Sequence, residues 1–146
     1  METIQTTLDS TLEAVDQAED MVLKEAAKLG LEDEEQHQVG MAVRECMVNA
    51  VVHGNRYNKN KRIHIDIERS KESITILIGD EGAGFDINAL PDPLSPENLM
   101  RQSGRGLMLA RAFMDDFDVH TRPGGGTEVR LVKRVQSLGV SEGGST

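Results

Sequence analysis

The residues best suited by type and spacing to hold a ligand run from Asp80 to Gly84, directly after the apolar segment Ile74–Ile78. We expect this apolar segment to form a buried strand, with Asp80 at its end and facing a cavity. A buried carboxylate needs hydrogen-bond donors, and the amino group of adenine is one suitable donor. Gly82 and Gly84 would let a flat ring approach the backbone closely.

A second glycine cluster, Gly104-Arg105-Gly106-Leu107, opens an apolar segment that we expect to be helical. The free N–H groups and the positive dipole end of such a helix suit a phosphate group. An ordinary turn is the alternative for either cluster alone, because short glycine motifs often occur by chance.

A polar stripe is predicted on a helix running from about Asp33 to His53. Glu45, Asn49 and His53 are each four residues from the next, and steps of four stay on one face of an α-helix. Gly54 and Asn55 should end the helix, because both tolerate a left-handed backbone. Such a stripe is either the wall of a site or, more commonly, solvated surface. The positions that should pack into the core are Val39, Val43, Cys46, Met47, Ala50 and Val51.

Composition narrows the class of protein. The chain has 146 residues, of which 38% are hydrophobic and 28% charged, and this fits one globular domain. The net charge of -9 argues against a surface that binds nucleic acid, although it does not exclude binding of a single nucleotide. The lone Cys46 should be a buried thiol, and the absence of a disulfide framework is consistent with the cytosol. The N-terminus does not resemble a signal peptide, and no segment is long enough to span a membrane.

The remaining pattern predicts the order of elements. A short edge strand at Ile4–Thr7 precedes a helix that ends near Leu29. Asp9, Ser10 and Thr11 are candidate N-caps of this helix, and Ser10 and Glu13 have the spacing of a capping box. Alternation over Ile63–Ile67 predicts a one-sided strand that pairs with the strand over 74–78. Two further strands, 117–122 and 127–132, flank a Pro-Gly-Gly-Gly hairpin turn. The fold class is therefore α+β, a two-layer sandwich with a mostly antiparallel sheet covered on one face by helices.

Residues 87–103 contain Pro91, Pro93 and Pro96, which exclude a continuous helix. A helical turn near Pro96 is compatible with this, but a loop of such length is usually functional or disordered. After Arg134 the chain has the composition of a flexible tail. We therefore predict one domain over residues 1–134 and a tail over 135–146.

Several common sites are excluded by their missing motifs. The chain has no Gly-x4-Gly-Lys-Ser/Thr loop, and neither glycine cluster completes a Gly-x-Gly-x-x-Gly fingerprint. The His-Arg-Asp and Asp-Phe-Gly signatures of eukaryotic-type protein kinases are absent, and the histidines do not lie at zinc-binding spacing with the cysteine.

Taken as an ordered set, the motifs resemble the GHKL (Bergerat-fold) ATPase superfamily. Within it, the chain looks like the small bacterial anti-sigma-factor serine-protein kinases. The helix motif Glu45-x-x-x-Asn49-Ala50-x-x-His53-Gly54-Asn55 matches the N box of that family. The later boxes are matched by Asp80-x-Gly82-x-Gly84-Phe85-Asp86, Gly104-Arg105-Gly106-Leu107 and Gly126-Thr127. Each box is weak alone, but all four stand in order over about residues 4–134.

This resemblance implies an ATP site. Asp80 would bind the adenine amino group, with Thr127 supporting it directly or through water, and Gly82 and Gly84 would shape the adenine wall. Asn49 would ligate Mg²⁺ that bridges the triphosphate.

The same resemblance implies the catalytic groups. Glu45 would be the general base that takes a proton from a serine of a partner protein. The amides of Gly104, Gly106 and Leu107, together with Arg105, would hold phosphate oxygens, although Arg105 could instead contact a partner. Residues 87–103 would form the ATP lid, and His53 is expected to be a hydrogen-bonded structural residue.

In the resembling family, such a kinase sequesters a sigma factor and phosphorylates a STAS-type anti-anti-sigma protein, and dimers are common. The expected activity is therefore protein serine/threonine kinase, without direct nucleic-acid or membrane binding. An ATP-gated sequestration module with little or no phosphotransfer is the alternative, and Glu45 favours the kinase because binding alone needs no base. The catalytic domain of a sensor histidine kinase is disfavoured by the length of the chain.

Overall fold

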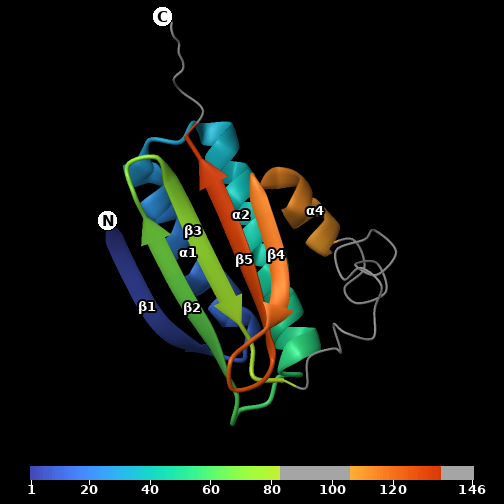
Figure 1. Cartoon of the computed structure of the whole chain (residues 1–146). Helices are drawn as coiled ribbons and strands as arrows, with labels where there is room; N and C mark the ends of the chain where they lie inside the picture. The colour runs from blue at the N-terminus through green and yellow to red at the C-terminus, as the bar shows by residue number, and fades with distance from the viewer. Residues whose placement is uncertain (83–105, 136–146) are drawn as a thin grey trace, which may run out of the picture.

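A computed structural model describes residues 1–82 and 106–135 of the chain. Its helices lie against one face of a five-stranded sheet, so the structure has two layers (Figure 1). This confirms the predicted α+β class. The sheet contains β1 (Glu2–Asp9), β2 (Arg62–Arg69), β3 (Ser73–Gly79), β4 (Asp116–Thr121) and β5 (Thr127–Arg134).

The strands follow the order β1-β2-β3-β5-β4, and each neighbouring pair is antiparallel. The edge strand predicted at Ile4–Thr7 is present as β1 and is longer than expected at both ends. Because β5 lies between β3 and β4, the beginning of β5 comes next to the end of β3, where Gly79 pairs with Glu128.

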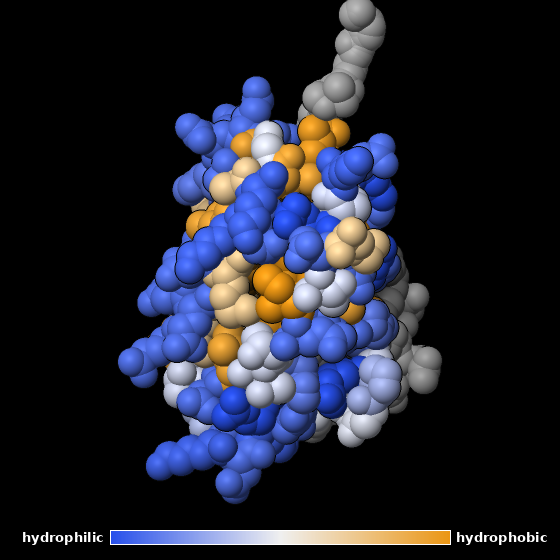
Figure 2. All heavy atoms as spheres, turned by 90° about the vertical axis from the view of Figure 1, so that its left-hand side faces the viewer, coloured by the Kyte–Doolittle hydropathy of each residue, from blue (hydrophilic) through white to orange (hydrophobic). Residues whose placement is uncertain are grey.

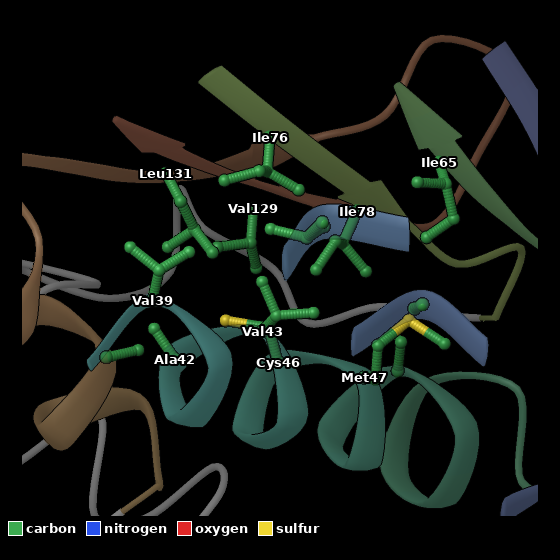
Figure 3. Close-up of a cluster of buried hydrophobic side chains, with 14 of the residues drawn as sticks. Val39, Ala42, Val43, Cys46, Met47, Ile65, Ile76, Ile78, Val129 and Leu131 are labelled. Carbon is green, nitrogen blue, oxygen red and sulfur yellow. The ribbon is translucent and has the colours of Figure 1, made fainter. Parts of the chain in front are cut away.

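Alternation along the strands explains why the helices cover one face. Ile63, Ile65 and Ile67 of β2 are fully buried, whereas the residues between them are only half-buried. Figure 3 shows side chains of the helical layer, including Val43 and Cys46, pointing toward the sheet, where Ile78 and other apolar residues meet them. Ile, Val, Leu, Met and Ala supply most of this core, and Phe117 is a buried aromatic residue in it.

The helical layer consists of α1 (Leu12–Leu29), α2 (Asp33–Val48), a π-helical segment η1 (Asn49–Gly54) and α4 (Gly106–Phe113). Gly30 ends α1 in a left-handed conformation with φ 93°, as glycine allows. Thr11, one of the candidate N-caps, caps this helix, and its hydroxyl accepts from the Ala14 N–H; the capping box expected at Ser10 is therefore wrong. Ser10 is instead buried in contacts with a distant loop.

The second helix ends about where predicted, but its last turn has a different geometry. The helix reaches Gly54, but its last turn is π-helical, with the Asn55 N–H donating to the Ala50 carbonyl five residues earlier. Asn55 keeps a right-handed backbone, and the left-handed positions fall on Arg56 and Tyr57, at φ 52° and 60°. The helix therefore ends where predicted, but the left-handed backbone expected at Gly54 and Asn55 is wrong.

Lys133 of β5 fixes α4 from inside the molecule. Its side chain is 93% buried, and its ammonium donates to the carbonyl of Phe113 at 2.8 Å and to Oε1 of Gln38 at 3.3 Å. A cation at a helix C-terminus interacts favourably with the last carbonyls. Lys133 thus ties the end of α4 to α2 and β5.

The hairpin between β4 and β5 is the predicted glycine turn. Gly124, Gly125 and Gly126 all have positive φ, as the tight reversal requires. β4 ends at Thr121, one residue before the predicted Arg122, and β5 extends two residues beyond the predicted end. The predicted lid over 87–103, the helical turn near Pro96 and nearly all of the predicted tail lie outside the described residues, so the domain boundaries stay a prediction.

Figure 2 shows the side of the molecule on which β1 forms the edge of the sheet. Hydrophilic side chains cover most of this side, and hydrophobic atoms gather near its centre. None of the helices in the described parts of the chain is both long and apolar enough to cross a membrane.

Candidate functional site

Asp80 lies immediately after β3 and is only 3% exposed. Its Oδ1 accepts hydrogen bonds from the Gly82 N–H at 3.0 Å and the Thr127 N–H at 3.1 Å. Its Oδ2 has no hydrogen bond to any residue that the structure describes. One carboxylate oxygen is therefore fixed by the fold, and the other is left for a different donor.

Burial raises the pKa of Asp80 above its ordinary value. The two backbone N–H donors act in the opposite direction, as do the positive charges of Arg122 and Lys61. The carboxylate is thus held in a setting that favours its neutral form, and a further donor at Oδ2 would favour the ionised form.

Three glycines allow three chain segments to meet around this carboxylate. A Cβ on Gly54 would lie 2.3 Å from Oδ2 of Asp80, and one on Gly126 would lie 2.1 Å from the Asp80 carbonyl oxygen. A Cβ on Gly82 would lie 1.9 Å from the carbonyl oxygen of Gly54. The end of η1, the end of β3 and the start of β5 can therefore converge only because these positions lack side chains.

Thr127 lies beside Asp80, as predicted, and is 7% exposed. Its backbone, and not its hydroxyl, contacts Asp80: the N–H donates to Oδ1 of Asp80, and the carbonyl accepts from the Asp80 N–H at 2.9 Å. The sequence pointed to the residue, but the group that contacts Asp80 is the peptide unit.

Asn55 is a member of the site that sequence reasoning left without a role. It is 2% exposed, and its Oδ1 accepts from the Glu81 N–H at 2.7 Å. Its Nδ2 donates to the Ser10 hydroxyl at 2.8 Å and to the Arg62 carbonyl at 3.0 Å. One buried amide thus holds the residue after Asp80 against the start of β2 and the turn before α1. Its only sequence signal was its place at the end of the helix motif.

Asn49 begins η1, and its Oδ1 is buried without a hydrogen-bond partner. A buried polar atom without a partner is costly in a folded protein and calls for an explanation. An amide oxygen is a suitable ligand for a hard divalent cation such as Mg²⁺. The residue present therefore fits the metal-ligand role that the motif implies.

Glu45 lies in the last part of α2, one turn before Asn49, and is half-buried. Its carboxylate makes no hydrogen bond or ion pair with the described residues. His53 does not fit its expected role, since it is exposed and makes no side-chain hydrogen bond within the described ranges. The change from α-helical to π-helical geometry at Asn49 ends the regular spacing by four on which the stripe depended.

The remaining predicted site residues are only partly placed. Gly84, Gly104 and Arg105 lie outside the described residues. Gly106 begins α4, and the side chain of Leu107 is 1% exposed in the core, so Leu107 has only its backbone to offer a phosphate. The Cys46 thiol, also in the core, has its pKa raised by burial, which agrees with a structural role.

A comparison with protein-family models finds the histidine kinase-like ATPase domain over residues 8–133. The chain belongs to this ATPase family. The match contains every helix and strand described here except most of β1 and the last residue of β5.

Curated relatives in the family are similar over most of the chain. The anti-sigma F factor of Thermoanaerobacter sp. (strain X514) is 37% identical over 114 residues, which is 77% of this chain and 79% of the relative. The anti-sigma F factor of Bacillus subtilis (strain 168) is 30% identical over 102 residues, covering 67% and 68%. The serine-protein kinase RsbW of Oceanobacillus iheyensis is 30% identical over 105 residues, covering 68% and 66%.

A solved structure agrees with the fold of the family. The crystal structure of the RsbU and RsbW domains of a Mycobacterium tuberculosis protein matches with a TM-score of 0.63 and 20% sequence identity. The match covers 92% of this chain and 32% of that longer chain. At this level of identity the likeness concerns the fold alone.

Proposed function

We propose that this member of the family is an ATP-dependent serine-protein kinase and anti-sigma factor. It would bind a sigma factor and phosphorylate a serine of a STAS-type anti-anti-sigma antagonist. The observation that carries the proposal is the pair formed by Glu45 and Asn49. A carboxylate that has no partner among the described residues lies one helical turn from a buried amide oxygen that has none there either. The relatives named anti-sigma F factor and serine-protein kinase support it.

Asp80 would select adenine. Because the Gly82 and Thr127 N–H groups occupy Oδ1, Oδ2 is the atom that would accept the adenine amino group. Gly82 and Gly84 would leave room for the ring. Asp80 would therefore recognise adenine without any movement of its carboxylate.

Asn49 would hold Mg²⁺ through its Oδ1. Among the residues that the structure describes, no three His, Cys, Asp or Glu side chains gather as a metal site. This suits Mg²⁺, which usually takes one or two protein ligands and completes its shell with phosphate oxygens and water. When bound, the ion would neutralise charge on the triphosphate.

Glu45 would act as the general base. Its carboxylate would take the proton of the partner's serine hydroxyl while that oxygen forms a bond to the γ-phosphorus. The bond between the γ-phosphorus and the β–γ bridging oxygen breaks, and ADP leaves with the electron pair.

The amides at Gly104, Gly106 and Leu107, with Arg105, would hold the phosphate oxygens beneath a lid over 87–103. A homodimer is the proposed assembly.

The test is Glu45→Gln, which keeps the size of the side chain and removes the base. We expect ATP affinity within about twofold of the original, measured by calorimetry, and transfer of labelled phosphate to STAS proteins reduced at least about a hundredfold. The matched control is Glu34→Gln at the exposed start of α2, which should change neither quantity.

Undiminished transfer in Glu45→Gln would show that Glu45 is not the base. The alternative outcome is that the unaltered protein binds ATP and a sigma factor but transfers phosphate to no partner. That result would favour an ATP-gated sequestration module.

A further inference from the structure

An open hollow lies on the face of the sheet that the helices leave uncovered. Its volume is about 630 Å³, and we call it the His64 hollow. His64, Asp66, Arg122 and Glu128 supply its charged groups, which are of both signs. None of the residues assigned to ATP or to phosphotransfer lines the hollow. Its interest lies in the contacts that its charged groups make with one another.

Nε2 of His64 contacts two groups of opposite kind. It lies 2.5 Å from Oε2 of Glu81 and 3.0 Å from Nη2 of Arg122. An ionised carboxylate can only accept a hydrogen bond, and a guanidinium can only donate one. Because a single ring nitrogen either carries a hydrogen or does not, it cannot serve both groups at once. The two contacts therefore compete for Nε2.

The protonation state of the imidazole decides this competition. A protonated ring carries hydrogen on both nitrogens, so Nε2 donates to Glu81, and the charge of the ring repels Arg122. A neutral ring with its hydrogen on Nδ1 leaves Nε2 bare, and Nε2 then accepts from Arg122. The hydrogen bond from His64 is the largest influence on the pKa of Glu81, which is lowered. Histidine is the side chain that ordinarily changes charge between about pH 5 and pH 8, so a change of pH can move Nε2 from one partner to the other.

Gly79 gives Arg122 its path to His64. Gly79 is the register partner of His64 on β3, and a Cβ there would lie 3.0 Å from Cδ of Arg122. The Arg122 side chain therefore crosses β3 at a position that has no side chain. Its Nη1 donates to the Gly125 carbonyl at 3.2 Å, which ties the guanidinium to its own hairpin.

The other charged groups near His64 leave this competition in place. Two of them already have an ion-pair partner: Glu128 with His120 and Arg62 with Asp9. Burial, followed by the charges of neighbouring glutamates, raises the pKa of Asp66, and the His64 ring acts in the opposite direction. On β1 the register partner of His64 is the uncharged Thr7.

Glu81 belongs to one wall of the Asp80 pocket. It directly follows Asp80, and its N–H donates to Oδ1 of Asn55 at 2.7 Å. Its Oε1 accepts from the Arg62 N–H at 3.1 Å, while its Oε2 faces His64. The hydrogen bond from His64 thus adds to the contacts that fix the chain directly after Asp80.

Arg122 belongs to the opposite wall. Its N–H donates to the Gly126 carbonyl at 2.9 Å, in the hairpin that leads into β5. Gly126 in turn packs closely against the Asp80 carbonyl. One imidazole can therefore hold either the segment after Asp80 or the hairpin, and its protonation selects which.

We propose that His64 is a positioning residue for the nucleotide site and that it tightens the site when it is protonated. Holding Glu81 would fix the chain between Asp80 and Gly82, whose N–H keeps Oδ1 of Asp80 in place. In the neutral state Nε2 accepts from Arg122 and Glu81 is released, so fewer molecules have the Asp80 carboxylate ready for a ligand. Apparent affinity falls with this fraction. The inference rests on the proposed binding of a nucleotide at Asp80 and adds a dependence on pH to it.

The first test needs no nucleotide. Nitrogen NMR of isotope-labelled histidine rings shows which ring nitrogen carries hydrogen, and the signals missing from His64→Gln identify those of His64. At about pH 8.5 we expect Nε2 of His64 to be bare in the original protein and to carry hydrogen in Arg122→Met, which cannot donate. Nε2 carrying hydrogen in the original protein at that pH would overturn the proposal.

The second test measures ADP affinity with Mg²⁺ by calorimetry from about pH 5.5 to about pH 8.5. The variant is His64→Gln, whose amide can still contact Glu81 and Arg122 but carries no charge. The ratio of the two affinities removes the titrations of ADP and of Asp80, which both proteins share. The advantage of the original protein over the variant should be about threefold larger at the acid end, as for a partly exposed charge pair. A ratio that does not vary with pH would overturn the proposal.

The matched control is His37→Gln, the same substitution at an exposed histidine of α2. Its affinity ratio to the original protein should not vary with pH, and a dependence as large as that of His64→Gln would overturn the proposal. Asp80→Asn separates the two hypotheses. Unchanged ADP affinity in Asp80→Asn would refute the nucleotide site itself, whereas weakened affinity there together with a constant ratio for His64→Gln would refute only the role of His64.

Discussion

In the proposed site, a single oxygen atom of Asp80 would carry the specificity for adenine. Two backbone N–H groups fix Oδ1, so the carboxylate cannot turn to offer either oxygen equally. An amide at this position would keep Oδ1 in place and put an NH₂ group where Oδ2 now lies. A donor would then face the adenine amino group, which is itself a donor.

We therefore predict that Asp80→Asn weakens ATP binding by about tenfold to a hundredfold, the usual worth of a hydrogen bond to a charged group. Calorimetry measures this directly, and circular dichroism should show an unchanged fold. Undiminished affinity would show that adenine does not bind at Asp80.

Although Asp80→Asn should weaken ATP binding, it should stabilise the protein in the absence of ATP. Because the folded pKa of Asp80 is raised, its contribution to stability is fully present below the ordinary Asp pKa and is lost as pH rises through the folded value. Asp80→Asn should thus unfold at a higher denaturant concentration than the original protein at neutral pH. The difference should shrink toward acid pH, and urea titrations at several pH values measure it.

Sequence reasoning found some site residues and missed others for a physical reason. Asp80 and Asn49 could be singled out because each stands at a recognisable position in a local pattern, a strand end and a helix face, and the family resemblance then gave each a role that stays a prediction. Asn55 was not assigned a role, because its partners Ser10, Arg62 and Glu81 come from three distant places in the chain. A contact set of this kind becomes visible only in the folded molecule.

Among the elements, η1 is the one that meets the Asp80 side chain most closely. Gly54 ends it against the Asp80 side chain, and that side chain cannot move away because two backbone groups hold it. The apolar period of the helix was readable from the sequence. The wide last turn was not, and it is this turn that brings Gly54 against the Asp80 side chain.

We predict that Gly54→Ala destabilises the protein by about 1–3 kcal/mol, the usual cost of forcing an extra methyl group into a packed region. It should also weaken ATP binding, because the Asp80 carboxylate would have to shift. Chemical denaturation and calorimetry give the two measurements.

Gly40→Ala is the matched control within the same helical layer. There the new methyl group would meet Oε2 of Glu19 at 3.0 Å, the end of a flexible side chain that can give way. Alanine also favours a helix over glycine by about 1 kcal/mol. We expect a stability close to that of the original protein, and a loss as large as that of Gly54→Ala would contradict the account of the carboxylate contact.

At the scale of the whole molecule, Glu25 joins the two layers. It is 5% exposed, and it accepts from Nε of Arg69 on β2 at 3.0 Å and pairs with Lys28 on its own helix at 3.1 Å. The hydrogen bond from Arg69 is the largest influence on the pKa of Glu25, which is lowered despite burial.

Glu25→Gln should therefore lower the free energy of unfolding at neutral pH by about 1.5–3 kcal/mol, the range for hydrogen bonds to charged groups. Because the folded pKa is depressed, this stability is present above the ordinary Glu pKa and is lost as pH falls through the folded value. The two proteins should thus converge in strong acid, as urea titrations across pH would show. Glu72→Gln in an exposed turn is the control, and it should follow the original protein at every pH.

The overall architecture was predictable because apolar residues recur every two positions in a strand and about every four in a helix. Both patterns can be read from residues that are close together in the sequence. The sheet order was less accessible, because nothing local places β5 between β3 and β4. That placement brings Gly126 and Thr127 to Asp80 across more than 40 residues of chain.

The position of β5 also has a consequence during protein synthesis. A ribosome makes the α2–η1 helix and β3 first, and both must wait for the strand that donates the Thr127 N–H to Asp80. A growing chain that stops short of this strand lacks one wall of the carboxylate pocket. The proposed nucleotide site would then be complete only once the last strand is made and inserted into the sheet.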